Sequence, residues 1–199
     1  MIAIIDVSGT NLTSLVNAIN RLGFNCILTH DVNQLQTASH VILPGVGTAR
    51  YGMDSLRSHN LIDAIKTLKQ PLLGICLGMQ LLLDYSEEDD VACLGLIPGA
   101  ATHLPADKEH PVPHMGWNKL QWNEHNVLQN GLSSEDYVYF VHSYALTQSD
   151  HILARCDYSQ SFAAIINKDN FYGMQFHPEK SAQSGMTLLK NFLTLESLC

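Results

Sequence analysis

Short hydrophobic runs alternate with amphipathic segments over the first half of the chain. The run IAII at residues 2–5 has no alternating polar positions, which predicts a strand buried on both faces. From Leu12 to Leu22, apolar residues recur at helical spacing until Gly23 ends the pattern, so a helix is expected there. Similar patterns predict strands at FNCILT (24–29), HVIL (40–43) and LLGIC (72–76), and a helix from Met53 to Leu68.

Strands that alternate with helices over short connections are typical of a parallel sheet covered on both faces. The second half of the chain has more prolines and more strands, which we expect to be partly antiparallel. The prolines of PADKEHPVP (105–113) mark a loop that is too short to establish a second domain, so we expect one domain over residues 1–199. The predicted strands are KLQW (119–122), YVYFVHSYAL (137–146), ILARC (152–156), FAAII (162–166) and FYGMQF (171–176), and a helix is expected at 184–198.

Composition and charge narrow the possible partners and location. The net charge of −8 comes without a cluster of Lys or Arg, so we do not expect nucleic acid as a partner. No apolar run approaches the roughly 18 to 20 residues of a membrane helix, and MIAIIDVSG has no signal-peptide pattern. The five cysteines include no CxxC pair and resemble reduced thiols. These features predict a cytoplasmic location away from membranes.

The stretch GICLG at residues 74–78 places Cys76 between two glycines, after a predicted strand and before a predicted helix. This is the context of a nucleophile elbow, in which the flanking positions must lack Cβ atoms because the backbone passes close to adjacent strands. The start of the helix would favour the thiolate, and the Leu77 N–H could meet an oxyanion. The alternative is that Cys76 is a buried apolar thiol beside glycines that only permit packing.

The stretch FHPE offers a general base and its orienting carboxylate. Pro178 disfavours helix at His177, so His177 and Glu179 are expected in extended chain, with both side chains on one side. Glu179 could then accept from one imidazole nitrogen while the other faces the thiol of Cys76. An isolated histidine before a proline is more often an ordinary loop residue, and only the combination with an elbow cysteine favours a catalytic triad.

Two further patterns, PGVG and HPVPH, contain residue types that can bind ligands. PGVG at 44–47 lacks the lysine of a phosphate loop and the third glycine of a dinucleotide site, so it is either an ordinary turn or a second source of oxyanion N–H groups. His110 and His114 in HPVPH have the spacing of a helical metal pair. The two intervening prolines exclude that helix, so no metal site is expected.

Taken together, PGVG, GICLGMQ and FHPE resemble the class I (triad) glutamine amidotransferases over nearly the whole chain. HMGWNKL and YFVHSY narrow the resemblance to the glutaminase subunits of imidazole glycerol phosphate synthases. The resemblance implies a flavodoxin-like three-layer α/β/α fold, with a mostly parallel central sheet and a small antiparallel part. It also implies hydrolysis of L-glutamine through a γ-glutamyl thioester, without a cofactor.

Roles can be carried over where residues match the family. Cys76 would be the nucleophile, His177 the proton shuttle and Glu179 its orienting group. The oxyanion would meet Leu77 and the turn around Gly45 and Val46. Glutamine would be held by residues that match Gly47, Gln80, Glu88, Ser143 and Tyr144. Glu88 could receive the substrate ammonium, or it could be a solvated member of the acidic run EEDD.

Two departures from the family are visible. Many relatives have a tyrosine and a glycine after the first aspartate, where this chain has Val7 and Ser8, and many have a phenylalanine after PGVG, where residues 48–50 are TAR. Neither touches the triad. Both leave the detail of the first turns and of the oxyanion turn open.

The family also implies a partner, a (β/α)₈ cyclase that forms a heterodimer with the glutaminase in histidine biosynthesis. The cyclase would use the ammonia to make imidazole glycerol phosphate and an aminoimidazole carboxamide nucleotide. Trp117, Asn118, Tyr139 and Lys180 match interface positions, although both aromatics could equally be core residues. The alternatives are a glutaminase subunit of another synthase, a catalytically silent interaction module and a stand-alone thiol hydrolase of γ-glutamyl compounds.

Overall fold

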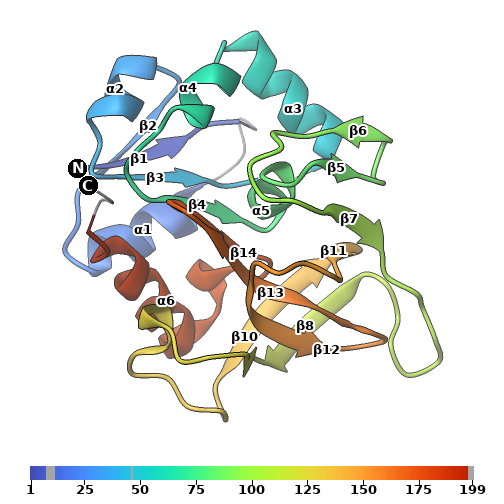
Figure 1. Ribbon diagram of the computed structural model, residues 1–199. Coiled ribbons are helices and arrows are strands. Elements are labelled where there is room, and N and C mark those ends of the chain that lie inside the picture. Colours follow the sequence, from blue (N-terminus) through green and yellow to red (C-terminus); the bar gives the residue numbers. More distant parts are fainter. Residues whose placement is uncertain (8–11, 46, 197–199) are drawn as a thin grey trace.

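The structure is a computed structural model that describes residues 1–7, 12–45 and 47–196. Eight of its strands form one twisted sheet that runs through the middle of the molecule (Figure 1). The first five strands in sheet order pair in parallel, and the last three pair antiparallel. In sheet order the strands are β2 (Cys26–Thr29), β1 (Ile2–Ile5), β3 (His40–Leu43), β4 (Leu72–Ile75), β14 (Phe171–Met174), β13 (Ser161–Lys168), β12 (Ile152–Asp157) and β9 (Gln121–Trp122).

Both faces of this sheet are buried, which explains why its inner strands are apolar without alternation. In β1, Ala3 and Ile5 pack into one hydrophobic cluster, whereas Ile2 and Ile4 pack into the other. The first cluster is covered by α2 (Val32–Thr37), α3 (Ala49–Ser58), α4 (Ile62–Lys66) and α5 (Leu77–Leu81). The second is covered by α1 (Thr13–Arg21) and α6 (Ala182–Leu193). The predicted three-layer α/β/α fold is confirmed, and the order β2-β1-β3-β4-β14 is flavodoxin-like.

Two smaller sheets lie beside the large one. Strand β8 (His114–Lys119) pairs antiparallel with β10 (Tyr137–His142). The four-stranded sheet contains β11 (Tyr144–Leu146), β7 (Ala100–His103), β5 (Tyr85–Ser86) and β6 (Val91–Ala92). Short 3₁₀ turns at Val127–Gln129 and Pro178–Lys180 complete the described elements.

Three predicted elements are divided in the structure. The helix expected from Met53 to Leu68 is two helices, because the chain turns at Asn60, whose φ is +56°. The strand expected at 137–146 breaks at Ser143, and its halves β10 and β11 join different sheets. KLQW is divided between the end of β8 and β9. The predicted domain, residues 1–199, stays a prediction, although strands from both halves of the chain share the large sheet.

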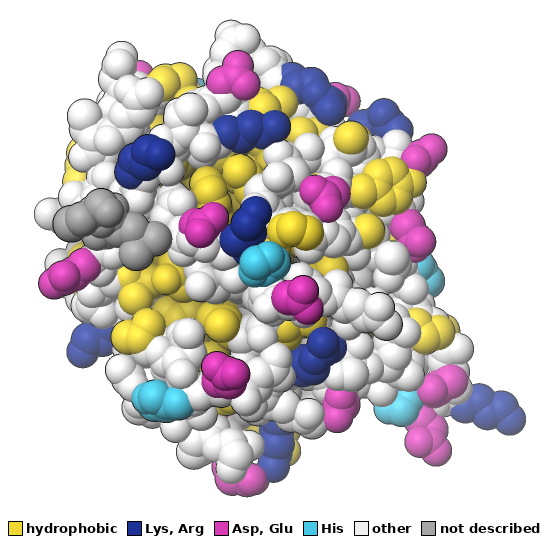
Figure 2. Space-filling model, viewed as in Figure 1, with side chains coloured by type: hydrophobic (Ala, Val, Ile, Leu, Met, Phe, Trp, Pro, Cys, Tyr) yellow, Lys and Arg dark blue, Asp and Glu magenta, His cyan; other side chains and the backbone are white. Residues whose placement is uncertain are grey.

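The surface carries no concentration of positive charge on the face seen in Figure 2. There, Lys and Arg side chains lie singly among Asp and Glu side chains. Of the helices in the described part of the chain, none has the length and apolar character needed to cross a bilayer.

Candidate active site

Cys76 occupies a sharp turn between β4 and α5. Its backbone has φ +53° and ψ −112°, a conformation that residues with a side chain rarely adopt. The Cys76 N–H donates to the Met174 carbonyl at 2.8 Å, and the Cys76 carbonyl accepts from Met79 N–H at 3.0 Å. These bonds hold the strained residue at the end of β4. The elbow conformation predicted for GICLG is therefore confirmed.

The flanking glycines are required by close backbone contacts. A Cβ atom on Gly78 would lie 1.8 Å from the carbonyl oxygen of Leu43 in β3. A Cβ on Gly74 would lie 2.6 Å from the Gly78 carbonyl oxygen. The turn that projects Cys76 is thus packed directly against neighbouring backbone, which leaves no room for any other residue at these two positions.

His177 reaches Cys76 because β14 is the neighbour of β4 in the sheet. The His177 N–H donates to the Tyr139 carbonyl at 3.0 Å, and the ring Nδ1 lies 2.9 Å from Glu179 Oε1. Burial by itself lowers the pKa of His177. Hydrogen bonds and charge interactions with Cys76 and Glu179 outweigh burial and raise the pKa to about 10. The arrangement favours an imidazolium at His177, which lies between the sulfur of Cys76 and the carboxyl group of Glu179.

The local backbone around Glu179 differs from the expectation. His177 is extended, but Pro178, Glu179 and Lys180 form a 3₁₀ turn instead of continuing as extended chain. Proline suits the first position of such a turn because its φ is already helical and its missing N–H needs no partner. The turn still brings Glu179 Oε1 to His177, so the expected pairing forms through a different local geometry.

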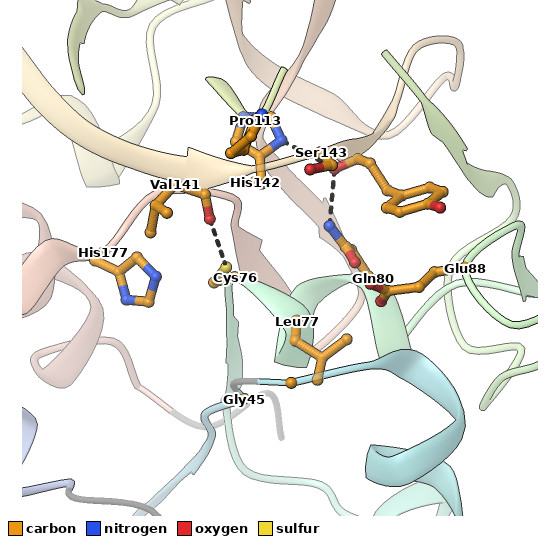
Figure 3. A pocket seen from close by; sticks show the side chains of 12 residues that line it. Gly45, Cys76, Leu77, Gln80, Glu88, Pro113, Val141, His142, Ser143 and His177 are labelled. Carbon is orange, nitrogen blue, oxygen red and sulfur yellow. Dashed lines mark hydrogen bonds between the residues drawn. The ribbon is translucent and has the colours of Figure 1, made fainter. Parts of the chain in front are cut away.

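A cavity of about 350 Å³ opens above Cys76 (Figure 3). The close-up shows His177 and Glu88 on either side of Cys76. Cys76, His177 and every described residue that was predicted for the oxyanion or the substrate line this cavity. Val46, which was also predicted for the oxyanion, lies outside the described residues. The cavity is lined by Gly45, Gly47, Cys76, Leu77, Gln80, Glu88, Pro113, Val141, His142, Ser143, Tyr144 and His177.

Glu88 differs from its acidic neighbours in the run EEDD. Glu87, Asp89 and Asp90 are exposed, whereas Glu88 is partly buried and lines the cavity. Its Oε2 accepts from the Ala49 N–H at 3.1 Å, at the start of α3. Burial raises the pKa of the Glu88 carboxyl. Glu88 is therefore less solvated than the rest of the acidic run, and it lines the same cavity as Cys76.

Comparison with known proteins accords with this geometry. Residues 3–195 match the family described as glutamine amidotransferase class-I. The chain belongs to this family. The amidotransferase is 67% identical over 199 residues to the imidazole glycerol phosphate synthase subunit HisH 2 of Legionella pneumophila (strain Paris), with all of both chains covered. It is 47% identical over 192 residues to the HisH subunit of Haemophilus influenzae, covering 96% of each chain.

Solved structures share the fold of this amidotransferase at lower identity. A crystal structure of a glutamine amidotransferase has a TM-score of 0.74 at 17% identity and covers 96% of both chains. A putative GMP synthase subunit from Thermoplasma acidophilum has a TM-score of 0.71 at 21% identity, covering 96% of this chain and 91% of the other. These likenesses confirm the fold class.

The predicted interface residues of the amidotransferase lie along β8, along β10 and after His177. Trp117 is 51% exposed, so its assignment as a core residue is wrong. It is the cross-strand partner of Tyr139, and the two rings meet edge to face with centroids 5.9 Å apart. Asn118 donates to the Asp157 carbonyl at 2.8 Å, and Lys180 is exposed.

Several residues of the site were not singled out from the sequence. Pro113, Val141 and His142 line the cavity. His142 is buried, and its Nδ1 and Nε2 lie 2.9 Å from the Tyr144 carbonyl and 3.1 Å from His114 Nδ1. Burial lowers the pKa of His142 to about 3 and that of His114 to about 4, so both rings are neutral at neutral pH. The sequence signal for Val141 and His142 was their place in the motif YFVHSY, next to the predicted Ser143.

Proposed function

We propose that this chain is the glutaminase subunit of an imidazole glycerol phosphate synthase and supplies ammonia to a cyclase subunit. The observation that carries the proposal is the 67% identity to the HisH 2 subunit of Legionella pneumophila from end to end. Relatives this similar over their whole length usually share a substrate as well as a fold. The more distant structural neighbours support only the fold, because one fold can host many functions.

The first half of the reaction uses Cys76 and His177. The Cys76 thiolate attacks the side-chain carbonyl carbon of L-glutamine, and the oxyanion would be met by the backbone N–H groups of Leu77, Gly45 and Val46. The His177 imidazolium, whose pKa is raised to about 10, gives its proton to the leaving nitrogen. Ammonia departs and a γ-glutamyl thioester remains on Cys76.

The second half regenerates the thiolate. Neutral His177 takes a proton from a water molecule that attacks the thioester carbonyl, and collapse of the tetrahedral intermediate releases glutamate. Glu179 keeps His177 oriented through the 2.9 Å contact during both steps. Of the substrate residues, Glu88 would receive the ammonium group of glutamine, and Ser143, Tyr144, Gln80 and Gly47 would also hold the substrate.

The cyclase is proposed to dock on the surface formed by Trp117, Asn118, Tyr139 and Lys180. Strand β10 supports this choice because it carries Tyr139 and also the cavity residues Val141 and His142. Ammonia released at Cys76 would then enter the partner before bulk water could protonate it. The cytoplasmic location and the heterodimer stay predictions.

The test measures glutamate formed from L-glutamine by the isolated chain, by the chain with a candidate cyclase, and by the pair with the nucleotide ligand of the cyclase. We expect low activity alone and the highest activity in the liganded pair, because a turn that holds an oxyanion donor is worth about 10²–10³ in rate. The Cys76→Ala variant should bind the cyclase and hydrolyse no glutamine. Full activity without a partner would instead favour a stand-alone hydrolase.

A further inference from the structure

Gln175 is a buried amide beside the nucleophile that the reaction scheme leaves unused. It follows Met174, the last residue of β14, whose partner in the parallel strand β4 is Ile75. Gln175 therefore stands next to Cys76 across the sheet. Its N–H donates to the Ala164 carbonyl at 2.9 Å, and the residue is fully buried. A polar side chain that is buried away from water needs a hydrogen-bond partner for each of its polar atoms.

A chain of hydrogen bonds orients this amide. The Gln80 Nε2 donates to the Tyr144 carbonyl at 2.9 Å and to Gln175 Oε1 at 3.1 Å. A backbone carbonyl only accepts, so Gln80 must present its nitrogen there, and Gln175 must present its oxygen to Gln80. The remaining atom, Gln175 Nε2, then faces Cys76 Sγ at 3.9 Å.

The sulfur of Cys76 has different partners in its two protonation states. As a thiol it can donate to the Val141 carbonyl, which lies 3.8 Å from Sγ. As a thiolate it has no proton to donate, so it cannot form a hydrogen bond with the Val141 carbonyl oxygen, which only accepts. The thiolate needs donors, and Gln175 Nε2 supplies one in addition to His177. Hydrogen bonds to an ionised group are among the stronger ones in proteins.

We propose that Gln175 is a positioning residue that donates an N–H to the Cys76 thiolate, and that Gln80 holds Gln175 in the orientation this requires. The proposal rests on the proposed glutaminase function, in which the thiolate is the nucleophile. It also limits the role of Gln80. Because both of its N–H groups are used within the protein, Gln80 can meet the substrate only through Oε1.

The experiment compares Gln175→Met and Gln175→Glu with Gln70→Met in the complex with the cyclase. Gln70 is a matched control, a buried amide that donates to Leu35 O at 2.5 Å and accepts from Lys69 N–H at 3.2 Å. Both kinetic constants for glutamine and the pH dependence of Cys76 alkylation by iodoacetamide are measured. Cys93 and Cys156 interfere little, since burial raises the pKa of their thiols to about 11 and about 12.

Gln175→Met is expected to lower kcat about 10-fold with little change in KM, and to move Cys76 alkylation to higher pH. Gln175→Glu should have a lower kcat than Gln175→Met at neutral pH, because it places a carboxylate beside the thiolate. Its kcat should recover in part at lower pH, where a protonated carboxyl can donate to the sulfur. Gln70→Met should leave the alkylation profile unchanged. This proposal is overturned if Gln175→Met alkylates like the wild type, or if Gln70→Met shifts the profile equally.

The two proposals can fail separately. A wild-type complex that hydrolyses no glutamine would remove the proposed function, while iodoacetamide, which needs only the sulfur, would still report whether Gln175 acts on Cys76. If Gln175→Met does not fold, Gln175→Glu keeps an acceptor for Gln80 and tests the same donor.

Discussion

The charge of His177 is set by two opposing effects. Burial lowers the pKa of the imidazole, whereas Cys76 and Glu179 raise it, and the net result is a pKa of about 10. The unfolded chain has the ordinary value near 6.5. Folding therefore increases proton binding at His177, so the imidazolium contributes stability that is complete below pH 6.5 and is lost as the pH rises towards 10.

Replacing Glu179 with Gln should lower the pKa of His177 and remove part of this stability. We expect the difference in unfolding free energy between wild type and Glu179→Gln to be largest near pH 6 and to shrink as the pH approaches 10. Urea denaturation at several pH values measures the difference. Glu135→Gln is the control, because Glu135 pairs with Lys119 at the surface, where such pairs contribute little. A difference that grows with pH would contradict the assigned charge of His177.

At the scale of elements, the position of the nucleophile depends on how closely α5 approaches β3. Gly78 allows this approach because its α-carbon faces the Leu43 carbonyl. Helix α5 carries Leu77 and Gln80 and begins directly after Cys76, so any shift of α5 moves the nucleophile and the cavity wall together. The glycine is therefore a requirement of both packing and catalysis.

Gly78→Ala should be among the most destabilising substitutions in the chain, above about 4 kcal/mol, since a Cβ 1.8 Å from an oxygen forces backbone to move. Gly23→Ala is the comparison. Gly23 has φ +86° but open space around its α-carbon, so only the cost of a left-handed alanine, about 1–2 kcal/mol, is expected. Urea denaturation gives both values. Equal costs would show that the contact with Leu43 does not matter.

At the scale of the whole molecule, the cavity and the proposed docking surface share the strand β10. Alternate residues of β10 face different surroundings, with Val138 and Phe140 buried and Tyr137 and Tyr139 more exposed. The exposed side meets Trp117 of β8, while the end of the strand reaches the cavity. A partner that contacts Trp117 would thus press on the strand that forms part of the active-site wall.

Trp117→Ala should leave the melting temperature of the isolated chain nearly unchanged, because half of the side chain is already in solvent. It should weaken cyclase binding or uncouple glutamine hydrolysis from cyclisation. Phe140→Ala is the contrasting variant on the paired strand. Phe140 is fully buried, and its loss should cost about 3–5 kcal/mol. Calorimetry measures the loss of stability, and a binding titration measures the loss of cyclase affinity. The docking proposal would be contradicted if the Trp117→Ala chain were destabilised but still coupled glutamine hydrolysis to cyclisation normally.

Local sequence determined the features that depend on neighbours along the chain. The unalternated run IAII predicted a strand with two buried faces, and the glycines on both sides of Cys76 favoured a turn that packs against backbone. The pairing of His177 with Glu179 was also predicted, although it forms across a 3₁₀ turn instead of along a fully extended chain.

Tertiary structure decided the features that require contact between segments far apart in the sequence. The break at Ser143 separates β10 from β11 because each finds a different sheet, although the sequence 137–146 reads as one strand. Gln175 meets Cys76 only through the register of β14 on β4, and His142 meets His114 only through the pairing of β10 with β8. Trp117 is exposed because β8 and β10 form a separate two-stranded sheet. An apolar or amide side chain is compatible with core, surface or active site, and only packing chooses among them.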